Sequence, residues 1–219
     1  MADRAAPTVR EGLVDPGSPS AEPFRTLRLA LQLRSQAEDT TAIMVTSAES
    51  RTGKSTTTAN YASLSAFGGA RVLLVDADVR SPVQHEIFGI SRSPGLVEYV
   101  AARSSLERLV QHVSVQLHVL TAGQPVARAS DVTHSSRIAD LLREASNSYD
   151  VVVMDTPPML ATADAEALAA HSGVEVVFVF DHSSGRRNVA KSLRRLELIN
   201  ARIAGLVLNR SGEPVVYGH

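Results

Sequence analysis

Short runs of valine, isoleucine and leucine alternate with helical patterns along most of the chain. The runs are almost continuously apolar, which is typical of parallel strands whose two faces are both covered. Strand and helix in regular alternation predict an α/β fold, a doubly wound and mostly parallel sheet flanked by helices. In such sheets, ligands bind beyond the carboxyl ends of the strands. We expect strands at 42–48, 71–78, 115–122, 151–157, 174–180 and 203–209.

The length of 219 residues and the 44% hydrophobic content suit one large domain. We expect a flexible segment at 1–20, the domain at 21–210 and a flexible tail at 211–219. The 22 basic and 23 acidic residues offer no electrostatic footprint for nucleic acid. Without cysteine, disulfides, thiolate metal sites and a cysteine nucleophile are excluded. No apolar run is long enough to cross a bilayer, so we expect a cytoplasmic protein whose membrane contact comes through a partner.

A glycine-containing loop follows the first expected strand and opens a helix. It resembles a phosphate-binding P-loop with Ala48 in place of the first glycine. Gly53 allows close approach of the backbone, Lys54 places a charge on the β- and γ-phosphate oxygens, and the Ser55 hydroxyl supplies a Mg²⁺ ligand. We therefore expect a nucleotide carrying Mg²⁺ at this loop. The predicted nucleotide-binding residues of this loop are Glu49, Ser50, Arg51, Thr52, Gly53, Lys54, Ser55 and Thr56.

Carboxylates follow two other strands. Asp76 and Asp78 share one face while the strand persists, and two such close carboxylates call for a nearby cation, for which nucleotide-bound Mg²⁺ is a candidate. Asp155 ends the run "VVVMD", as a Walker B aspartate does. Taken alone, the first two could equally cap the next helix or turn. Asn209, at the end of the last strand, fits either an adenine contact or a turn.

Together these motifs resemble the bacterial protein-tyrosine kinases of capsule and exopolysaccharide systems, a branch of the P-loop NTPases related to ParA and MinD. The resemblance runs from about Glu22 to Asn209. It rests on the P-loop, on "LLVDADVR" as the family's Walker A′ motif, and on "VVVMDTPP" as its Walker B motif. The role of Arg80, the last residue of the A′ motif, stays open between steadying the acidic pair and facing another subunit.

The resemblance implies ATP-dependent tyrosine phosphorylation, including autophosphorylation, that regulates polysaccharide synthesis and export. It makes Lys54, Asp76, Asp78 and Asp155 the catalytic residues. Ser55, Asp78 and Asp155 would organise Mg²⁺, and Asp76 would accept the tyrosine proton. A transmembrane activator, the chain-length regulator of export, would recruit the protein to the inner face of the plasma membrane.

The family also assembles into rings through a helix that "EPFRTLR" resembles. This implies a homo-oligomer, with an octamer as the candidate ring size, and an interface at Glu22, Arg25 and Arg28. On residues alone, these three fit a solvated helix face with i,i+3 charge pairs. The family's tyrosine-rich tail is reduced here to Tyr217, which becomes the candidate phosphoacceptor.

Two other functions remain open. A ParA- or MinD-like regulatory ATPase would carry a lysine at the second P-loop position, where this chain has Glu49. A non-catalytic nucleotide-binding scaffold would fit the scarcity of tyrosines. Its difficulty is that Lys54, Asp76, Asp78 and Asp155 are all present. Hydrolysis of ATP without phosphotyrosine would favour either of these alternatives.

Overall fold

The computed structural model describes residues 12–35, 42–102 and 104–211. Within them a central sheet has the strand order β3-β4-β2-β5-β1-β6-β7. All neighbouring strands pair in parallel except β3 and β4. The doubly wound, mostly parallel fold predicted from the sequence is confirmed. The strands are β1 Ala42–Ser47, β2 Val72–Asp76, β3 Gln111–His112, β4 Leu117–Leu120, β5 Val151–Asp155, β6 Val174–Phe180 and β7 Arg202–Leu208.

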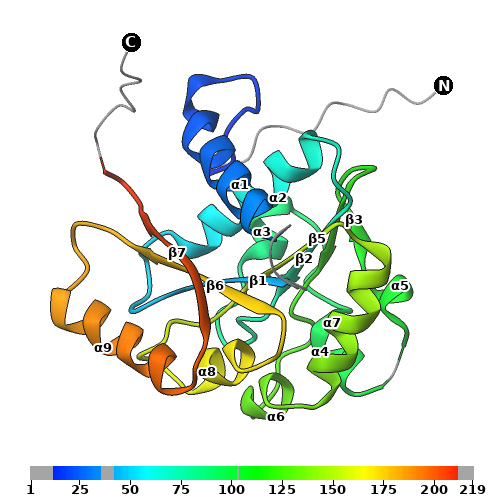
Figure 1. The fold of residues 1–219 in the computed structure, drawn as a ribbon. Coiled ribbons are helices and arrows are strands. Elements are labelled where there is room, and N and C mark those ends of the chain that lie inside the picture. The colour runs from blue at the N-terminus through cyan, green and yellow to red at the C-terminus, as the bar shows by residue number, and fades with distance from the viewer. Residues whose placement is uncertain (1–11, 36–41, 103, 212–219) are drawn as a thin grey trace.

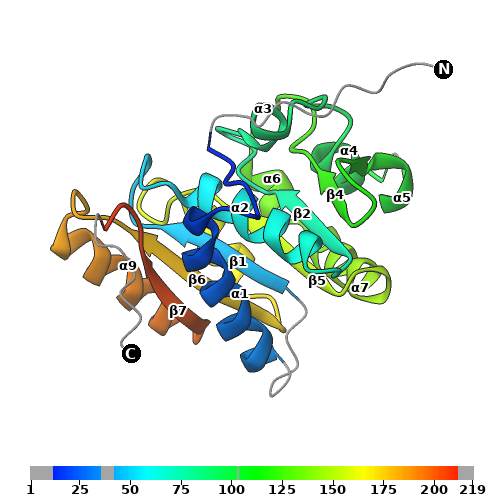
Figure 2. The same cartoon turned by 90° about the horizontal axis from the view of Figure 1, so that it is seen from above.

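Helices cover both faces of the sheet (Figure 1). One apolar layer packs α1 and α2 on one face, and a larger layer lies under the helices of the other face. Seen from above, β7 and α9 lie at one edge of the sheet and α4 and α5 at the other (Figure 2). Besides a 3₁₀ turn at Pro19–Ala21, the helices are α1 Glu22–Ser35, α2 Lys54–Phe67, α3 Gln84–Phe88, α4 Leu96–Val100, α5 Leu106–Leu109, α6 Ser130–Thr133, α7 Arg137–Ser148, α8 Asp164–Ala169 and α9 Arg186–Leu198.

The burial of the strands agrees with the nearly continuous apolar runs in the sequence. In β1, β2 and β6 nearly every residue is buried, as expected for strands between two layers of helices. The antiparallel β3 was not predicted, because two residues carry no periodicity. Between β2 and β3, the short helices α4 and α5 are separate elements.

The N-terminal part of the described chain is attached to α2. Asn60, buried on that helix, accepts a hydrogen bond from the Val14 N–H (2.8 Å) and donates one to the Gly12 carbonyl (2.7 Å). The remainder of the segment predicted to be flexible, 1–11, lies outside the described residues, as do 212–219 of the predicted tail. In the described part of the chain, no helix is long and apolar enough to span a membrane.

Candidate nucleotide and phosphoryl-transfer site

The P-loop connects β1 to α2 at the carboxyl edge of the sheet. Gly53 has a φ of +86°, and a Cβ there would lie 2.0 Å from Asn209 Nδ2. Only glycine accommodates both the backbone conformation and this contact. The Gly53 carbonyl then accepts the Thr57 N–H (2.9 Å), which begins the helix at Lys54. The backbone N–H groups at the start of α2 are thus available for an anion.

Residues outside the loop hold it in place. Asn209 donates to the Thr52 carbonyl (2.9 Å), so its side chain supports the P-loop. Arg210 donates to the Arg51 carbonyl (3.1 Å) and to Asp181 Oδ2 (3.1 Å), which ties the loop to the ends of β6 and β7. Sequence reasoning missed Asp181 and Arg210. The position of Asp181 just after a predicted strand was the available signal.

Glu49 has a different contact. Its Oε1 accepts a hydrogen bond from Asn188 Nδ2 (2.9 Å) on α9. Ser50 is exposed on the loop, and Thr56 lies on α2 beside Gly12. The predicted loop residues are therefore contiguous, but they do not all face the same space.

The predicted carboxylates converge beside the loop. Asp76 and Asp155 are paired in the parallel register of β2 and β5, and both are fully buried. Lys54 Nζ lies 3.2 Å from Asp78 Oδ2 and 3.2 Å from Asp155 Oδ1. Although burial lowers the pKa of Lys54, Asp155 and Asp78 raise it more, and the net pKa lies above the usual value. The lysine is therefore the cation of this carboxylate cluster.

Asp76 has the most perturbed environment of the described carboxylates. Its Oδ2 accepts hydrogen bonds from the N–H groups of Val83 (3.1 Å) and Gln84 (3.0 Å). Its Oδ1 is buried without a hydrogen-bond partner among the described residues. Burial, and next the charge of Asp155, raise the pKa of Asp76 to about 8, while the Gln84 N–H acts in the opposite direction. A carboxylate with such a pKa can exchange a proton near neutral pH.

Gln84 joins the cluster and was missed by sequence reasoning. The side chain is fully buried, and its amide donates to Asp155 Oδ2 (2.8 Å) and to the Ser55 carbonyl (3.1 Å). It thereby connects α2, β5 and the first turn of α3. A single glutamine beyond the A′ motif has no sequence pattern that would have identified it.

The donor set suits a nucleotide-bound Mg²⁺. No group of three or more His, Cys, Asp or Glu side chains within the described ranges could hold a metal by itself. Mg²⁺ normally takes only one or two carboxylates and completes its shell with phosphate oxygens and water. The Ser55 hydroxyl and the carboxylates of Asp78 and Asp155 surround Lys54 Nζ, which lies 3.1 Å from Ser55 Oγ. These residues fit the ion when phosphate is present.

Arg80 turns away from this cluster. It donates to Asp164 Oδ2 (2.7 Å) at the start of α8, and Asp164 also accepts from Thr133 Oγ1 (3.0 Å) on α6. Although burial raises the pKa of Asp164, these hydrogen bonds, that of Arg80 foremost, lower it more and keep it below the usual value. The guanidinium therefore fixes the A′ loop to the layer of helices beneath it.

Asp164→Asn should destabilise the protein by about 1–3 kcal/mol at pH 7, because a charge-assisted bond to Arg80 is lost. Since the folded pKa of Asp164 is depressed, its contribution is present above the unfolded pKa and is lost as pH falls through the folded one. Thermal unfolding from pH 7 down to pH 3 should show the two proteins converging. Asp140→Asn on α7, where Asp140 forms exposed pairs, is the control and should change stability by less than about 1 kcal/mol. Equal losses for both variants would contradict the anchoring role.

The other predicted positions lie elsewhere. Glu22 and Arg25 form an i,i+3 ion pair (2.5 Å) on α1, and Arg28 points toward the end of α2. Glu22 and Arg25 are partly exposed on α1, whereas Arg28 Nε is buried beside the carboxyl-terminal end of α2, opposite the end that begins at the P-loop. Tyr217 lies outside the described residues. The tyrosines at 61 and 99 are buried.

Comparison with known proteins places this geometry in a family. The family model described as ParA, NUBPL iron-transfer P-loop NTPase, matches residues 39–215. The tyrosine-protein kinase YwqD of Bacillus subtilis is 33% identical over 90% of this chain and 84% of its own length. This chain belongs to the bacterial tyrosine-kinase family. The kinase domain of the Escherichia coli tyrosine kinase ETK superimposes with a TM-score of 0.87 at 29% identity, covering 100% of this chain and 88% of that one.

Other members of the bacterial tyrosine-kinase family are longer than this chain. The putative tyrosine-protein kinase EpsB of Ralstonia solanacearum is 34% identical over 89% of this chain, which spans only 26% of that protein. The septum site-determining protein MinD of Pyrococcus horikoshii, solved with Mg-ADP, has a TM-score of 0.67 at 23% identity over 78% of this chain and 70% of that one, which shows the shared fold. This chain therefore shares the family's fold, and in it Lys54 of the P-loop contacts Asp78 of the A′ motif and Asp155 of the B motif.

Proposed function

We propose that this chain is an ATP-dependent tyrosine kinase domain that phosphorylates itself and regulates capsular or exopolysaccharide synthesis and export. The observation that carries the proposal is the environment of Asp76. Asp76 is a buried carboxylate with a pKa of about 8, in strand register with Asp155 and next to a P-loop lysine. A general base is most effective when its pKa lies near the working pH.

The proposed division of roles follows the contacts. Lys54 would move from the carboxylates to the β- and γ-phosphate oxygens and neutralise their charge, while the P-loop N–H groups hold the phosphates in line. Mg²⁺ held by Ser55, Asp78 and Asp155 would neutralise charge that develops on the transferred group. Asp76 would accept the tyrosine proton, with Val83 and Gln84 fixing its orientation through Oδ2. Gln84 would keep Asp155 oriented.

We also propose how the domain is recruited to the membrane and how copies of it assemble. A transmembrane activator, the chain-length regulator of polysaccharide export, would recruit the cytoplasmic domain to the membrane. Copies of the domain would form a ring, with eight subunits as the candidate size, through Glu22, Arg25 and Arg28. In a ring, the tail of one copy could present Tyr217 to the site of the next.

A MinD-like regulatory ATPase is the weaker proposal for this chain. Glu49 occupies the P-loop position at which that class needs a lysine that reaches the partner's phosphates. Its carboxylate is moreover held within the same chain by Asn188. It cannot supply a positive charge to a second nucleotide.

Incubation with ATP and Mg²⁺, with and without the cytoplasmic fragment of the activator, tests the proposal when phosphate is mapped by mass spectrometry. We expect phosphotyrosine, with Tyr217 as the main site, and its loss in Tyr217→Phe. Tyr149→Phe is the matched control, because Tyr149 is partly buried with its hydroxyl 2.9 Å from His118 Nδ1. ATP hydrolysis without phosphotyrosine, even in the presence of the activator fragment, would rule out the kinase and favour a regulatory ATPase.

A further inference from the structure

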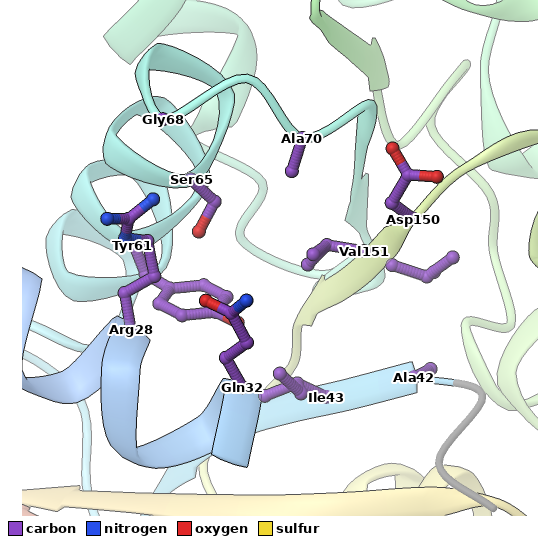
Figure 3. A pocket seen from close by; sticks show the side chains of 11 residues that line it. Arg28, Gln32, Ala42, Ile43, Tyr61, Ser65, Gly68, Ala70, Asp150 and Val151 are labelled. Atoms are coloured by element: carbon purple, nitrogen blue, oxygen red, sulfur yellow. The ribbon is translucent and has the colours of Figure 1, made fainter. Parts of the chain in front are cut away.

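A cavity opens at the amino-terminal edge of the sheet, opposite the P-loop. Its volume is about 340 Å³, and it lies between α1, the second half of α2 and the beginnings of β1 and β5 (Figure 3). Because α2 rises about 1.5 Å per residue from Lys54, Tyr61 and Ser65 of the cavity wall lie roughly 10 and 16 Å along the helix from its start at the P-loop. The cavity is therefore separate from the site described above.

Three hydrogen-bond donors meet on one side of this cavity. Arg28 comes from α1, and Tyr61 and Ser65 are one turn apart on α2 (Figure 3). Ser65 is only 1% exposed, and its Oγ has no hydrogen-bond partner in the described part of the chain. Figure 3 shows this oxygen directed into the cavity. Arg28 Nε is likewise buried without a partner among the described residues. Buried donors left without acceptors cost free energy, and an acceptor bound in the cavity would remove that cost.

Among the described residues, no carboxylate forms an ion pair with Arg28. Arg28 packs against Gly68 at the end of α2, where a Cβ would lie 1.8 Å from its Nη1. Asp150 lies on the far side of the cavity. Its carboxylate accepts hydrogen bonds from Arg71 Nη2 (2.7 Å) and from the Arg71 backbone N–H (2.8 Å). These bonds from Arg71 lower the pKa of Asp150 below its usual value. Burial raises the pKa of Tyr61 to about 12, so its hydroxyl keeps its proton at neutral pH.

Gln32 of α1 adds an amide beside these donors (Figure 3). The remaining walls include apolar side chains of Ile43 and Ala42 at the start of β1, Val151 at the start of β5, and Ala70. A ligand must therefore combine one acceptor group with a short apolar body. A guanidinium with two hydroxyl donors matches the planar oxygens of a carboxylate. A single cation in a cavity of this size does not compensate the double charge of phosphate.

We propose that the cavity between α1 and α2 is a binding site for a small monocarboxylate with an aliphatic or aromatic body. Its carboxylate is held by Arg28, Tyr61 and Ser65, and its apolar body rests against Ile43 and Val151. This site goes beyond the proposed kinase activity and does not depend on it. Because Arg28 is also one of the residues proposed for the ring interface, carboxylate binding and ring assembly would compete for the same side chain.

Titration of the full chain with benzoate and with 3-methylbutanoate tests the site, with benzamide and inorganic phosphate as controls. We expect saturable amide NMR shifts at Ile43, Ser65 and Val151, and a rise of the unfolding midpoint of about 3 °C at tenfold excess over the Kd. Benzamide and phosphate should produce neither at these positions. The protein is kept at a concentration at which its mass in solution is that of a monomer.

Arg28→Met keeps the length of the side chain and should weaken carboxylate binding by about tenfold or more. Ser65→Ala retains the charge and should weaken it by a smaller factor, which provides a second test should Arg28→Met fold poorly. Lys191→Met removes an exposed charge on α9 and should leave binding unchanged. The proposal is wrong if neither acid binds, if the shifts map to the P-loop, or if Arg28→Met binds as wild type does. Amide NMR shifts that change with the protein concentration, and do not change when acid is added, would also overturn the proposal.

Discussion

Lys54→Met should reduce tyrosine phosphorylation by about 10²–10³-fold, because the charge that neutralises the phosphate oxygens is removed. The same substitution should lower stability. Lys54 is buried between Asp78 and Asp155, and removal of one partner from a buried ion pair costs about 3–5 kcal/mol. We expect this loss to be larger near pH 8 than near pH 5, because burial raises the pKa of Asp76 to about 8 and the proton that Asp76 takes up over this range reduces the negative charge around Lys54.

Phosphotyrosine formation and thermal unfolding between pH 5 and pH 8.5 measure both effects. Lys191→Met, which removes an exposed lysine on α9, is the control and should match wild type in each. A Lys54→Met protein that unfolds like wild type at pH 8 would show that the lysine does not compensate the buried carboxylates. Full phosphorylation by this variant would contradict its role at the phosphates.

Asp76→Asn should separate activity from stability. Loss of the general base is expected to lower the phosphorylation rate by about 10²–10⁴-fold. The variant should nevertheless be more stable than wild type at high pH, because asparagine carries no charge into a fully buried position. Its side-chain oxygen can still accept the N–H groups of Val83 and Gln84, as Asp76 Oδ2 does.

The pH dependence of stability follows from the difference between the folded and unfolded pKa of Asp76. The folded pKa of Asp76 is about 8, above the ordinary value of 3.8, so the folded protein holds a proton that the unfolded chain releases. Wild-type stability therefore falls as pH rises from about 4 to about 8, and Asp76→Asn lacks this part of the decline. The difference between their unfolding midpoints should grow across that window. Asp140→Asn, at an exposed position, should show no such growth. A constant difference between Asp76→Asn and wild type would show that Asp76 is ionised throughout.

The sequence was sufficient for the sheet and for the motifs at its carboxyl edge. An apolar run such as 174–180 predicts a strand of a parallel sheet independently of the loops around it. Each motif lies at the end of such a run. The register of β2 and β5, which sets Asp76 beside Asp155, could not be predicted, because it depends on how two distant segments pair. The contacts of Gln84, Arg210 and Asp164 depend on loop geometry for the same reason. Arg80, left open between two roles, contacts Asp164 instead of the acidic pair.

The most direct test of the proposed chemistry follows the γ-phosphate of ATP. With labelled ATP, Mg²⁺ and the activator fragment, label on tyrosine and label released as inorganic phosphate are counted in the same reaction across pH 6 to 9. We expect wild type to transfer label to tyrosine at a rate that rises toward about pH 8, as Asp76 ionises, and Asp76→Asn to lose this transfer. Label found only as inorganic phosphate, in wild type and Asp76→Asn alike, would contradict the proposed chemistry.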